Sequence, residues 1–234
     1  MIKLVILLST LLAVHNVQAR FVGGIGYIQP GEYRVDNEIN PLPLGISVVP
    51  MIFYRGERLS VLGPNLSYSL IKGPINFALS VGATGDRYKT ESLEQRDAAI
   101  NAGFSLRLLF LTLNYASDVS NVFDGNTMSA GIGWRFQLTQ SLFFTPSIKK
   151  EFLNSSYVNY YYGVSTDEAG RFTSYRVNSA VNDIYAIGLT YILNPIQSFS
   201  LNYSYKVFDQ VIFDSPTINE KSYGRLSFFW NYKF

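Results

Sequence analysis

The sequence contains no cysteine, and its single histidine is His15. Without cysteine the chain has neither a lipoprotein leader nor the disulfide bonds that stabilise many small secreted domains. Histidine and cysteine are also the commonest general base, the best thiolate nucleophile and the usual transition-metal ligands. Beyond residue 19 there is no run of 18 apolar residues, which excludes membrane-spanning helices. The composition therefore argues against most hydrolases, metal centres and helical membrane proteins.

Residues 1–19 have the features of a cleaved secretory signal peptide. Lys3 supplies the positive charge, Leu4–Val14 is largely apolar, and Val17-Gln18-Ala19 has the small-residue form of a cleavage site. Cleavage after Ala19 would leave residues 20–234 as a single domain. Losing Lys3 leaves 18 of the 19 basic residues against 17 acidic ones. This near-neutral balance without a clustered basic face predicts no nucleic-acid binding.

What the sequence does contain is a large share of aromatic residues, 15%, within segments that alternate apolar and polar residues. The last segment, Ser222–Phe234, shows the pattern best, because Trp230, Tyr232 and Phe234 fall on one face and Arg225 on the other. The same alternation recurs in Ile75–Ala83, Ile100–Leu108, Ala130–Leu138 and Phe199–Val207. The second face consists of Gly, Ala, Ser, Asn and occasional basic residues, which suits a narrow polar lumen.

These segments predict an all-β fold, an antiparallel transmembrane β-barrel in the outer membrane of a Gram-negative bacterium. Each segment is close to the roughly 9–11 residues with which a tilted strand crosses a bilayer. Lipid cannot satisfy an open sheet edge, so the strands must close into a ring. A soluble β-sandwich is the alternative, but the small polar second faces give no sign of a dry core. The expected surroundings are outer-membrane lipid and lipopolysaccharide.

Short and long links alternate along the chain, as such barrels require. We expect the short links to be periplasmic turns, and the long polar links to be extracellular loops, over roughly 84–98, 117–127, 151–181 and 208–221. Eleven segments can be counted, whereas single-chain bacterial barrels have an even number of strands. The segment Arg58–Ile71 changes its apolar phase across Gly63-Pro64, which requires a turn or a bulge. A bulge would give ten strands and a turn twelve; within this range of 10–12 we predict twelve.

Several short motifs occur in a combination that is informative as a set. The run YYYGVS, followed by Glu168, comprises Tyr160, Tyr161, Tyr162, Gly163, Val164 and Ser165. The other motifs are Val49-Pro50, Tyr54-Arg55-Gly56, Asp118-Val119-Ser120, Asp214-Ser215-Pro216 and the terminal Tyr232-Lys233-Phe234. Together they span essentially the whole processed chain. The combination resembles the MipA/OmpV family of outer-membrane proteins.

This resemblance implies an outer-membrane barrel that acts by binding. For the best-known type it implies a scaffold for cell-wall enlargement, which binds a murein-degrading lytic transglycosylase and a bifunctional murein synthase. Some relatives are linked to adhesion or to drug susceptibility, so a surface adhesin is an alternative. The family supplies no catalytic residues, and no cofactor is expected.

Two interpretations of the tyrosine run at Tyr160–Ser165 remain open. Tyrosines at the base of a loop are typical of an interfacial aromatic belt, with Gly163 permitting a tight turn. The same run would also suit a loop that folds inward and plugs or shapes the lumen.

The polar faces of the predicted strands carry a basic set. Its members are Arg107, Arg135, Lys149, Lys206 and Arg225. They can pair with carboxylates such as Glu151, Asp183 or Asp209 and brace the wall. Alternatively they form a lumen that favours anions, as basic rings do in pores. The second possibility would make the protein a small diffusion channel.

Four loop carboxylates, Asp118, Asp124, Asp209 and Asp214, lie near the predicted outer rim. Their oxygens suit Ca²⁺ or Mg²⁺ bound together with lipopolysaccharide. However, no EF-hand-like spacing occurs, so solvated loop charge is the simpler interpretation, and Asp214-Ser215-Pro216 is typical of a turn. Nor does any spacing select a Ser–Lys dyad or a carboxylate pair for catalysis. We therefore predict a protein that is not an enzyme.

Overall fold

The computed structural model describes residues 20–29, 31–38 and 48–234, so the predicted signal peptide lies outside the described residues. Most of the described chain is antiparallel strand. The strands of the main sheet are β1 (Arg20–Ile28), β2 (Val48–Arg55), β3 (Leu59–Leu62), β4 (Asn65–Ile71), β5 (Ile75–Thr84), β8 (Ala99–Leu108), β9 (Leu111–Asp118), β10 (Asn126–Gly133), β11 (Phe136–Gln137), β12 (Leu142–Leu153), β13 (Ala180–Asn194), β14 (Gln197–Val207) and β15 (Ser222–Lys233). The hairpin β6 (Tyr88–Thr90) and β7 (Leu93–Arg96) and the helices α2 (Ser155–Tyr162) and α3 (Gln210–Phe213) lie outside this sheet.

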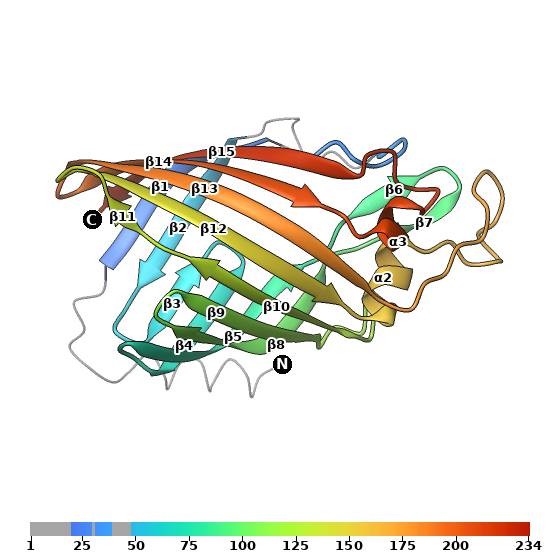
Figure 1. The fold of residues 1–234 in the computed structure, drawn as a ribbon, viewed down its shortest axis with the longest axis horizontal. Coiled ribbons are helices and arrows are strands. Elements are labelled where there is room, and N and C mark those ends of the chain that lie inside the picture. Colours follow the sequence, from blue (N-terminus) through green and yellow to red (C-terminus); the bar gives the residue numbers. More distant parts are fainter. Residues whose placement is uncertain (1–19, 30, 39–47) are drawn as a thin grey trace.

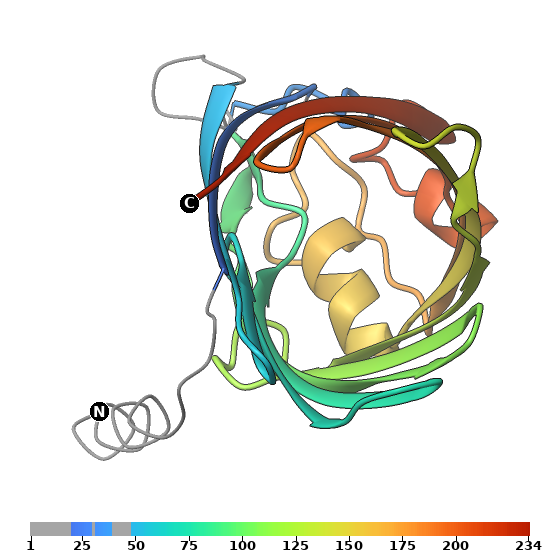
Figure 2. The same cartoon turned by 90° about the vertical axis from the view of Figure 1, so that its left-hand side faces the viewer.

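The main sheet closes into a ring (Figures 1 and 2). Apart from β10 and β11, sheet strands that follow each other in the chain pair with each other, and β1 pairs with β15. The very short β11 continues β10 after a break, and β10 and β11 both pair with β12. The described wall therefore consists of twelve strands, with β10 and β11 as one. The predicted outer-membrane barrel and the count of twelve are confirmed.

The segment of ambiguous phase, Arg58–Ile71, forms the separate strands β3 and β4. Leu62 pairs with Asn65 across Gly63, which has a φ of +55°. Glycine adopts this backbone conformation without steric penalty, so the phase change marks a turn and not a bulge. This short turn joins β3 to β4 on the side of the barrel where long loops were expected. The predicted alternation of short and long links thus has an exception here.

Large apolar side chains cover the outer surface of the ring. Trp230 of β15 is the register partner of Ile25 in β1 and of Phe199 in β14. Trp230, Ile25 and many equivalent side chains remain substantially exposed. They belong to no protein core, which excludes the β-sandwich; hydrocarbon covers such a surface in a membrane barrel. Tyr232 lies on the same face as Trp230, and the terminal Phe234 donates its backbone N–H to the carbonyl oxygen of Phe21, 2.9 Å away.

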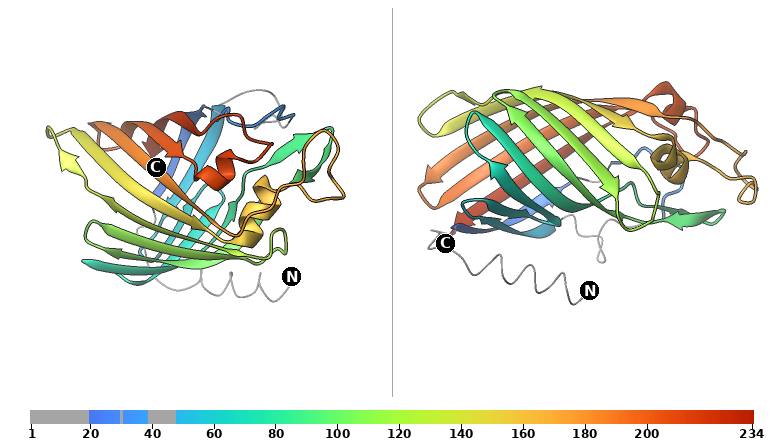
Figure 3. Two further views of the ribbon diagram at one scale, coloured as in Figure 1. Left: turned by 45° about the vertical axis from the view of Figure 1, so that its right-hand side comes forward. Right: turned by 90° about the horizontal axis from the view of Figure 1, so that it is seen from below.

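The two ends of the barrel differ in their links (Figure 1). At the turn end, drawn on the left, are the start of β1, the carboxyl terminus and the short links, such as 109–110 and 195–196. At the loop end are α2, α3 and the hairpin β6–β7. Figure 3 shows the strands tilted around the ring, with β6–β7 and the loop that follows α2 projecting past the loop end. In outer-membrane barrels the short turns face the periplasm and the long loops the exterior.

The main hydrophobic core lies inside the loop end. In Figure 2, α2 crosses the interior of the ring. The buried cluster gathers side chains from both helices and several loops, including Tyr33, Phe123, Tyr157, Val158, Phe208 and Ile212. We call α2, α3, residues 163–179 and the hairpin β6–β7 the plug. None of the described helices is long and apolar enough to cross a membrane.

Candidate functional site

The tyrosine run belongs to the plug. Asn154 caps α2 at its N-terminus, where its side-chain oxygen accepts the Tyr157 N–H at 3.0 Å. Tyr161 is 1% exposed and Tyr162 0% exposed. The Tyr161 ring packs against the ring of Tyr157, with 4.6 Å between centroids. The interpretation as an interfacial belt is therefore wrong for these two tyrosines, because they face the interior and not lipid.

Gly163 ends α2 without a left-handed conformation, since its φ is −76°. Its N–H donates to the carbonyl oxygen of Asn159 at 3.0 Å. A Cβ built on Gly163 would overlap that same carbonyl oxygen. Glycine is required here for this close approach of backbone to backbone. Gly163 has an extended backbone, so the glycine ends the helix through this close approach and not through the tight turn expected from the sequence.

A buried arginine, Arg34, connects the loop after β1 to the plug. Its Nη1 donates to the carbonyl oxygen of Tyr161 at 2.8 Å, and the guanidinium lies 4.7 Å and 4.6 Å from the ring centroids of Tyr88 and Tyr162. The Tyr162 hydroxyl donates to the carboxylate of Asp86. Burial raises the pKa of Tyr162, so this hydroxyl remains protonated. No sequence motif singled out Arg34 or Asp86.

The Asp86 carboxylate is charged although it lies among the plug side chains. Burial alone would raise the pKa of Asp86. The positive charges of Lys206 and Arg34, together with the hydrogen bond from Tyr162, outweigh burial and lower the pKa below its ordinary value. Asp86 and Arg34 thus compensate each other's charge within the plug.

Ser165 and Glu168 of the predicted motif fix the loop after α2 to the hairpin β6–β7. The Ser165 Oγ donates to Glu168 Oε2 at 3.0 Å, and Arg96 of β7 donates to the same oxygen at 2.8 Å. The Glu94 N–H donates to Glu168 Oε1 at 3.2 Å. Val164 is fully buried beside Tyr88 in a second small cluster. These motif residues therefore hold parts of the plug together.

The second motif, Asp214-Ser215-Pro216, meets the first although about fifty residues separate them. Ser215 is buried, and its Oγ donates to the carbonyl oxygen of Tyr162 at 2.6 Å. Asp214 is exposed and accepts a hydrogen bond from Gln210 at 2.7 Å. The structure thus brings Ser215 into contact with the tyrosine run, whereas the sequence indicated only a turn.

Asp118 organises the loop that follows β9. Its carboxylate accepts the N–H groups of Ser120, Val122 and Phe123 at 2.7–2.8 Å, and that of Asp124 at 3.1 Å. Asp209 similarly caps α3. Within the described part of the chain, no three Asp, Glu, His or Cys side chains gather in a way that could hold a metal ion. The four loop carboxylates therefore do not meet at a cation site.

The predicted basic set separates into three environments. Lys206 forms an ion pair with Glu151 at 2.8 Å, as the bracing interpretation expects. Arg225 is exposed, and its guanidinium lies 5.7 Å from the Tyr223 ring centroid. The other predicted carboxylate partners are engaged elsewhere, since Asp183 pairs with Lys150 and Asp209 caps α3.

The three remaining members, Arg107, Arg135 and Lys149, line one cavity of about 580 Å³ near the turn end. Among the described residues none of them has an ion pair, and the cavity lining contains no carboxylate. Arg135 stacks over the ring of Phe143, 3.9 Å from its centroid. Sequence reasoning assigned these residues to the polar face but could not show that they meet.

The closed ring, its apolar exterior and its plugged loop end define an outer-membrane β-barrel. The sequence model of the family described as "MltA-interacting protein MipA" matches residues 22–234. The chain therefore belongs to the MipA family and is a β-barrel of the Gram-negative outer membrane.

Solved structures with a similar fold include porins. The NanC porin in a rhombohedral crystal form has 10% identity and a TM-score of 0.43, over 92% of this chain and 100% of the porin. A loop L8 deletion mutant of OmpT from Vibrio cholerae has 7% identity and a TM-score of 0.38, over 94% and 76%. At such identities the similarity concerns the fold alone. No curated protein matches the sequence.

Proposed function

We propose that this protein is a non-enzymatic scaffold of the outer membrane that binds enzymes of murein turnover. Its proposed partners are a lytic transglycosylase of the MltA type and a bifunctional murein synthase. The observation that carries this proposal is the match of residues 22–234 to a family described as MltA-interacting.

The chemistry of the plug supports a binding role over catalysis. The described residues contain neither histidine nor cysteine. The hydroxyl of Ser165 is bonded to Glu168, and that of Ser215 to a backbone carbonyl oxygen. Glu168 also accepts a hydrogen bond from Arg96, and its pKa, lowered to about 2, makes it a weak base, so these hydroxyl groups act as structural hydrogen-bond partners.

Capture from cross-linked cells tests the proposal. Envelopes are solubilised in detergent, the tagged full-length protein is isolated, and the retained proteins are quantified by mass spectrometry against capture of an unrelated barrel. We expect both murein enzymes to be enriched specifically. Enrichment of neither enzyme over the unrelated barrel would overturn the scaffold function.

A diffusion channel is the second candidate, and the unpaired cations at the turn end favour it. Arg107, Arg135 and Lys149 would attract anions into the lumen. The plug argues against free passage, because its core fills the loop end with buried aromatic side chains. Planar-bilayer recordings separate the two functions: a scaffold should show no steady conductance, whereas a stable anion-selective current would establish the channel.

A further inference from the structure

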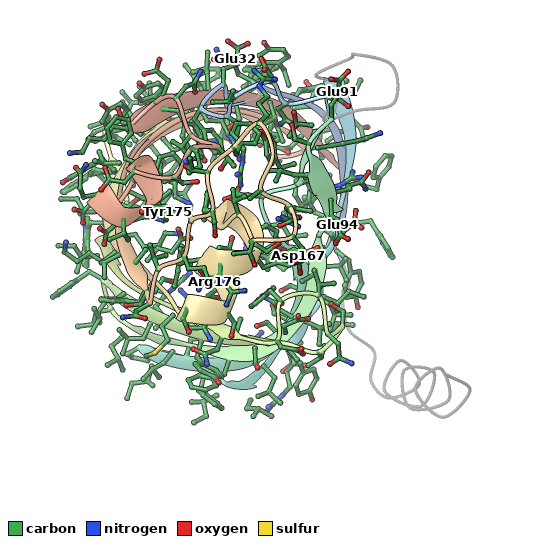
Figure 4. The ribbon with its side chains drawn as sticks, turned by 90° about the vertical axis from the view of Figure 1, so that its right-hand side faces the viewer. Glu32, Glu91, Glu94, Asp167, Tyr175 and Arg176 are labelled. Atoms are coloured by element: carbon green, nitrogen blue, oxygen red, sulfur yellow. The ribbon has the colours of Figure 1, made fainter. Side chains whose placement is uncertain are left out.

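Charge is distributed unevenly between the two ends of the barrel. Of the 17 acidic residues, Glu57 alone lies in a link at the turn end. Basic residues at or next to that end include Arg20, Arg55, Arg58, Lys72, Arg107, Arg135 and Lys233. Figure 4 shows the opposite, loop end, where Glu32, Glu91, Glu94 and Asp167 surround or overlie the mouth. The end that faces the periplasm thus presents positive charge.

The cations of the turn-end cavity are spread over neighbouring strands. Arg107 of β8, Thr112 of β9, Gly131 of β10 and Lys149 of β12 are successive register partners. Adjacent strands are about 4.8 Å apart, so the backbones of Arg107 and Lys149 are separated by about 14 Å. Gly131 leaves the lumen open between them, since a Cβ there would already contact Lys149.

An apolar rim borders this cavity. The two-residue link Leu109-Phe110 joins β8 to β9, and Leu109 has a φ of +54°. Glycine, asparagine and aspartate favour this conformation in hairpin turns, so leucine introduces strain. Leu109 is nevertheless 68% exposed and Phe110 51% exposed, and the Phe110 ring lies 6.3 Å from that of Trp134. Leucine gives this turn no conformational advantage, and its exposed apolar side chain is available for a contact outside the chain.

We propose that this surface, formed by Arg107, Leu109, Phe110, Arg135 and Lys149, binds an acidic peptide segment of a periplasmic protein. The three cations receive carboxylates inside the cavity, while the Leu109-Phe110 tip contacts an apolar side chain of the same segment. This inference rests on the proposed function, because it gives the periplasmic partner a concave binding site. Aromatic residues and arginine are the residue types enriched at the centres of protein interfaces.

Two observations favour a peptide over a small anion. An extended peptide advances about 3.4 Å per residue, so carboxylates four positions apart span the roughly 14 Å between Arg107 and Lys149. A compact anion can bind both residues only if their side chains converge on one point, whereas an extended peptide meets each of them where it stands. An apolar tip beside the cations would also contribute nothing to the binding of a compact anion such as citrate.

The binding test uses the full-length protein in detergent and defined probes. A short labelled peptide with a central leucine flanked by glutamates is compared with one whose glutamates are glutamines, and with citrate. We expect the acidic peptide to bind in a salt-sensitive manner and the neutral peptide to bind about tenfold more weakly or not at all. Absence of acidic-peptide binding, or binding of citrate alone, would overturn the inference.

Substitutions of the cavity residues test whether the acidic peptide binds at the proposed site. Combining Arg107→Gln, Arg135→Gln and Lys149→Gln should weaken acidic-peptide binding at least about tenfold. Arg225→Gln, which removes an inward cation outside the cavity lining, should leave binding unchanged. Leu109→Asn should weaken binding while the barrel remains at least as stable, because asparagine suits the turn. Heat-modifiable migration on gels verifies folding, and equal binding by the triple variant would contradict the site.

Binding of a purified MltA-type transglycosylase separates this inference from the proposed function. If the unaltered protein binds the enzyme and the triple variant binds it equally, the site is wrong but the scaffold function stands. If neither binds the enzyme while the acidic peptide distinguishes the variants, the site stands and this partner is wrong. If the inference and the proposed function are both correct, the triple variant should bind neither the acidic peptide nor the transglycosylase.

Discussion

The two ends of this barrel differ in whether their charged side chains have partners within the chain. At the loop end, the charged side chains that lie within or against the plug are matched within the chain: Arg34 lies beside Asp86, and Arg96 pairs with Glu168 at 2.8 Å. At the turn end, Arg107 and Arg135 face a cavity without a carboxylate. A buried charge requires a partner, whereas an accessible lumen leaves charge free for a ligand. The loop end is thus organised for internal cohesion and the turn end for external contact.

This difference also bears on the proposed scaffold function and on the position of the motifs singled out in the sequence. Tyr161, Tyr162 and Ser215 meet in the plug, at the end that faces away from the periplasm. Their contacts are internal and connect α2 to the segment that follows α3. A murein enzyme would meet the other end, where the turns and the cation cavity lie.

The largest effect is expected from Arg34→Ala, which removes the central cation of the plug. Asp86 would lose a neighbouring positive charge and the carbonyl oxygen of Tyr161 its donor. Removing one partner of a buried charge pair costs about 3–5 kcal/mol, and the lower end of this range is expected here because Lys206 still lies near Asp86. Amide hydrogen exchange of α2, followed by mass spectrometry, should therefore show a lower free energy of local opening.

Arg87→Ala provides the matched control, since Arg87 is close in sequence but exposed. It should leave exchange in α2 unchanged, and acidic-peptide binding at the turn end should survive both substitutions. Equal protection of α2 in the Arg34 variant and the unaltered protein would show that the plug does not depend on Arg34.

A smaller effect is expected from Gly163→Ala. The added methyl group would overlap the carbonyl oxygen of Asn159 and force the end of α2 to move. Overpacking of this kind costs about 1–3 kcal/mol. Proteolysis within residues 163–179 should become faster. Gly170→Ala in the same loop has open space around it and should leave the cleavage rate unaltered.

A still smaller effect is expected from Ser215→Ala, which removes the hydrogen bond between Ser215 and the tyrosine run. The carbonyl oxygen of Tyr162 would lose its buried donor, at a cost of about 1–2 kcal/mol. Protection of α2 from hydrogen exchange should decrease by a corresponding amount. The exposed Ser179 serves as the control, and a Ser179→Ala variant that is equally affected would contradict the role of Ser215.

The strands of the barrel wall could be predicted from the sequence because alternate residues of each strand face lipid and lumen, which gives the hydrophobicity a period of two residues. Trp230 and Phe199 lie on the outer face for that reason, and the phase change at Gly63 was sufficient to reach twelve strands. Each such inference uses residues that are neighbours in the chain or on one face of one strand. Register between strands and closure of the ring then follow from pairing geometry.

The plug could not be predicted in the same way. Arg34, Asp86 and Tyr162 come from three separate segments and meet only in the folded lumen. A lone arginine in a loop carries no periodic signal, and a tyrosine run is compatible with both lipid and protein surroundings. For the turn-end cations, alternation placed Arg107 and Lys149 on the inner face, but their meeting depends on pairing across β9 and β10.

The smallest expected effect concerns pH and Glu168. Burial alone would raise the pKa of Glu168, but hydrogen bonds from Arg96 and Ser165 outweigh it and lower the pKa from 4.5 to about 2. A carboxyl group with a lowered folded pKa stabilises the fold fully above its unfolded pKa and loses that contribution as pH falls. Because the site is near the surface, about 1 kcal/mol is expected.

Local opening of residues 163–179 should therefore become easier between about pH 4.5 and pH 2, and resistance to an acid-stable protease measures it. Glu168→Gln should open more readily at neutral pH and show a weaker dependence over this range. Asp167→Asn, at the exposed neighbouring position, should retain the unaltered profile. A profile that is flat in the unaltered protein would mean that the Arg96–Glu168 contact does not hold the loop to the hairpin. In that case the internal matching of charge at the loop end would be restricted to the region around Arg34.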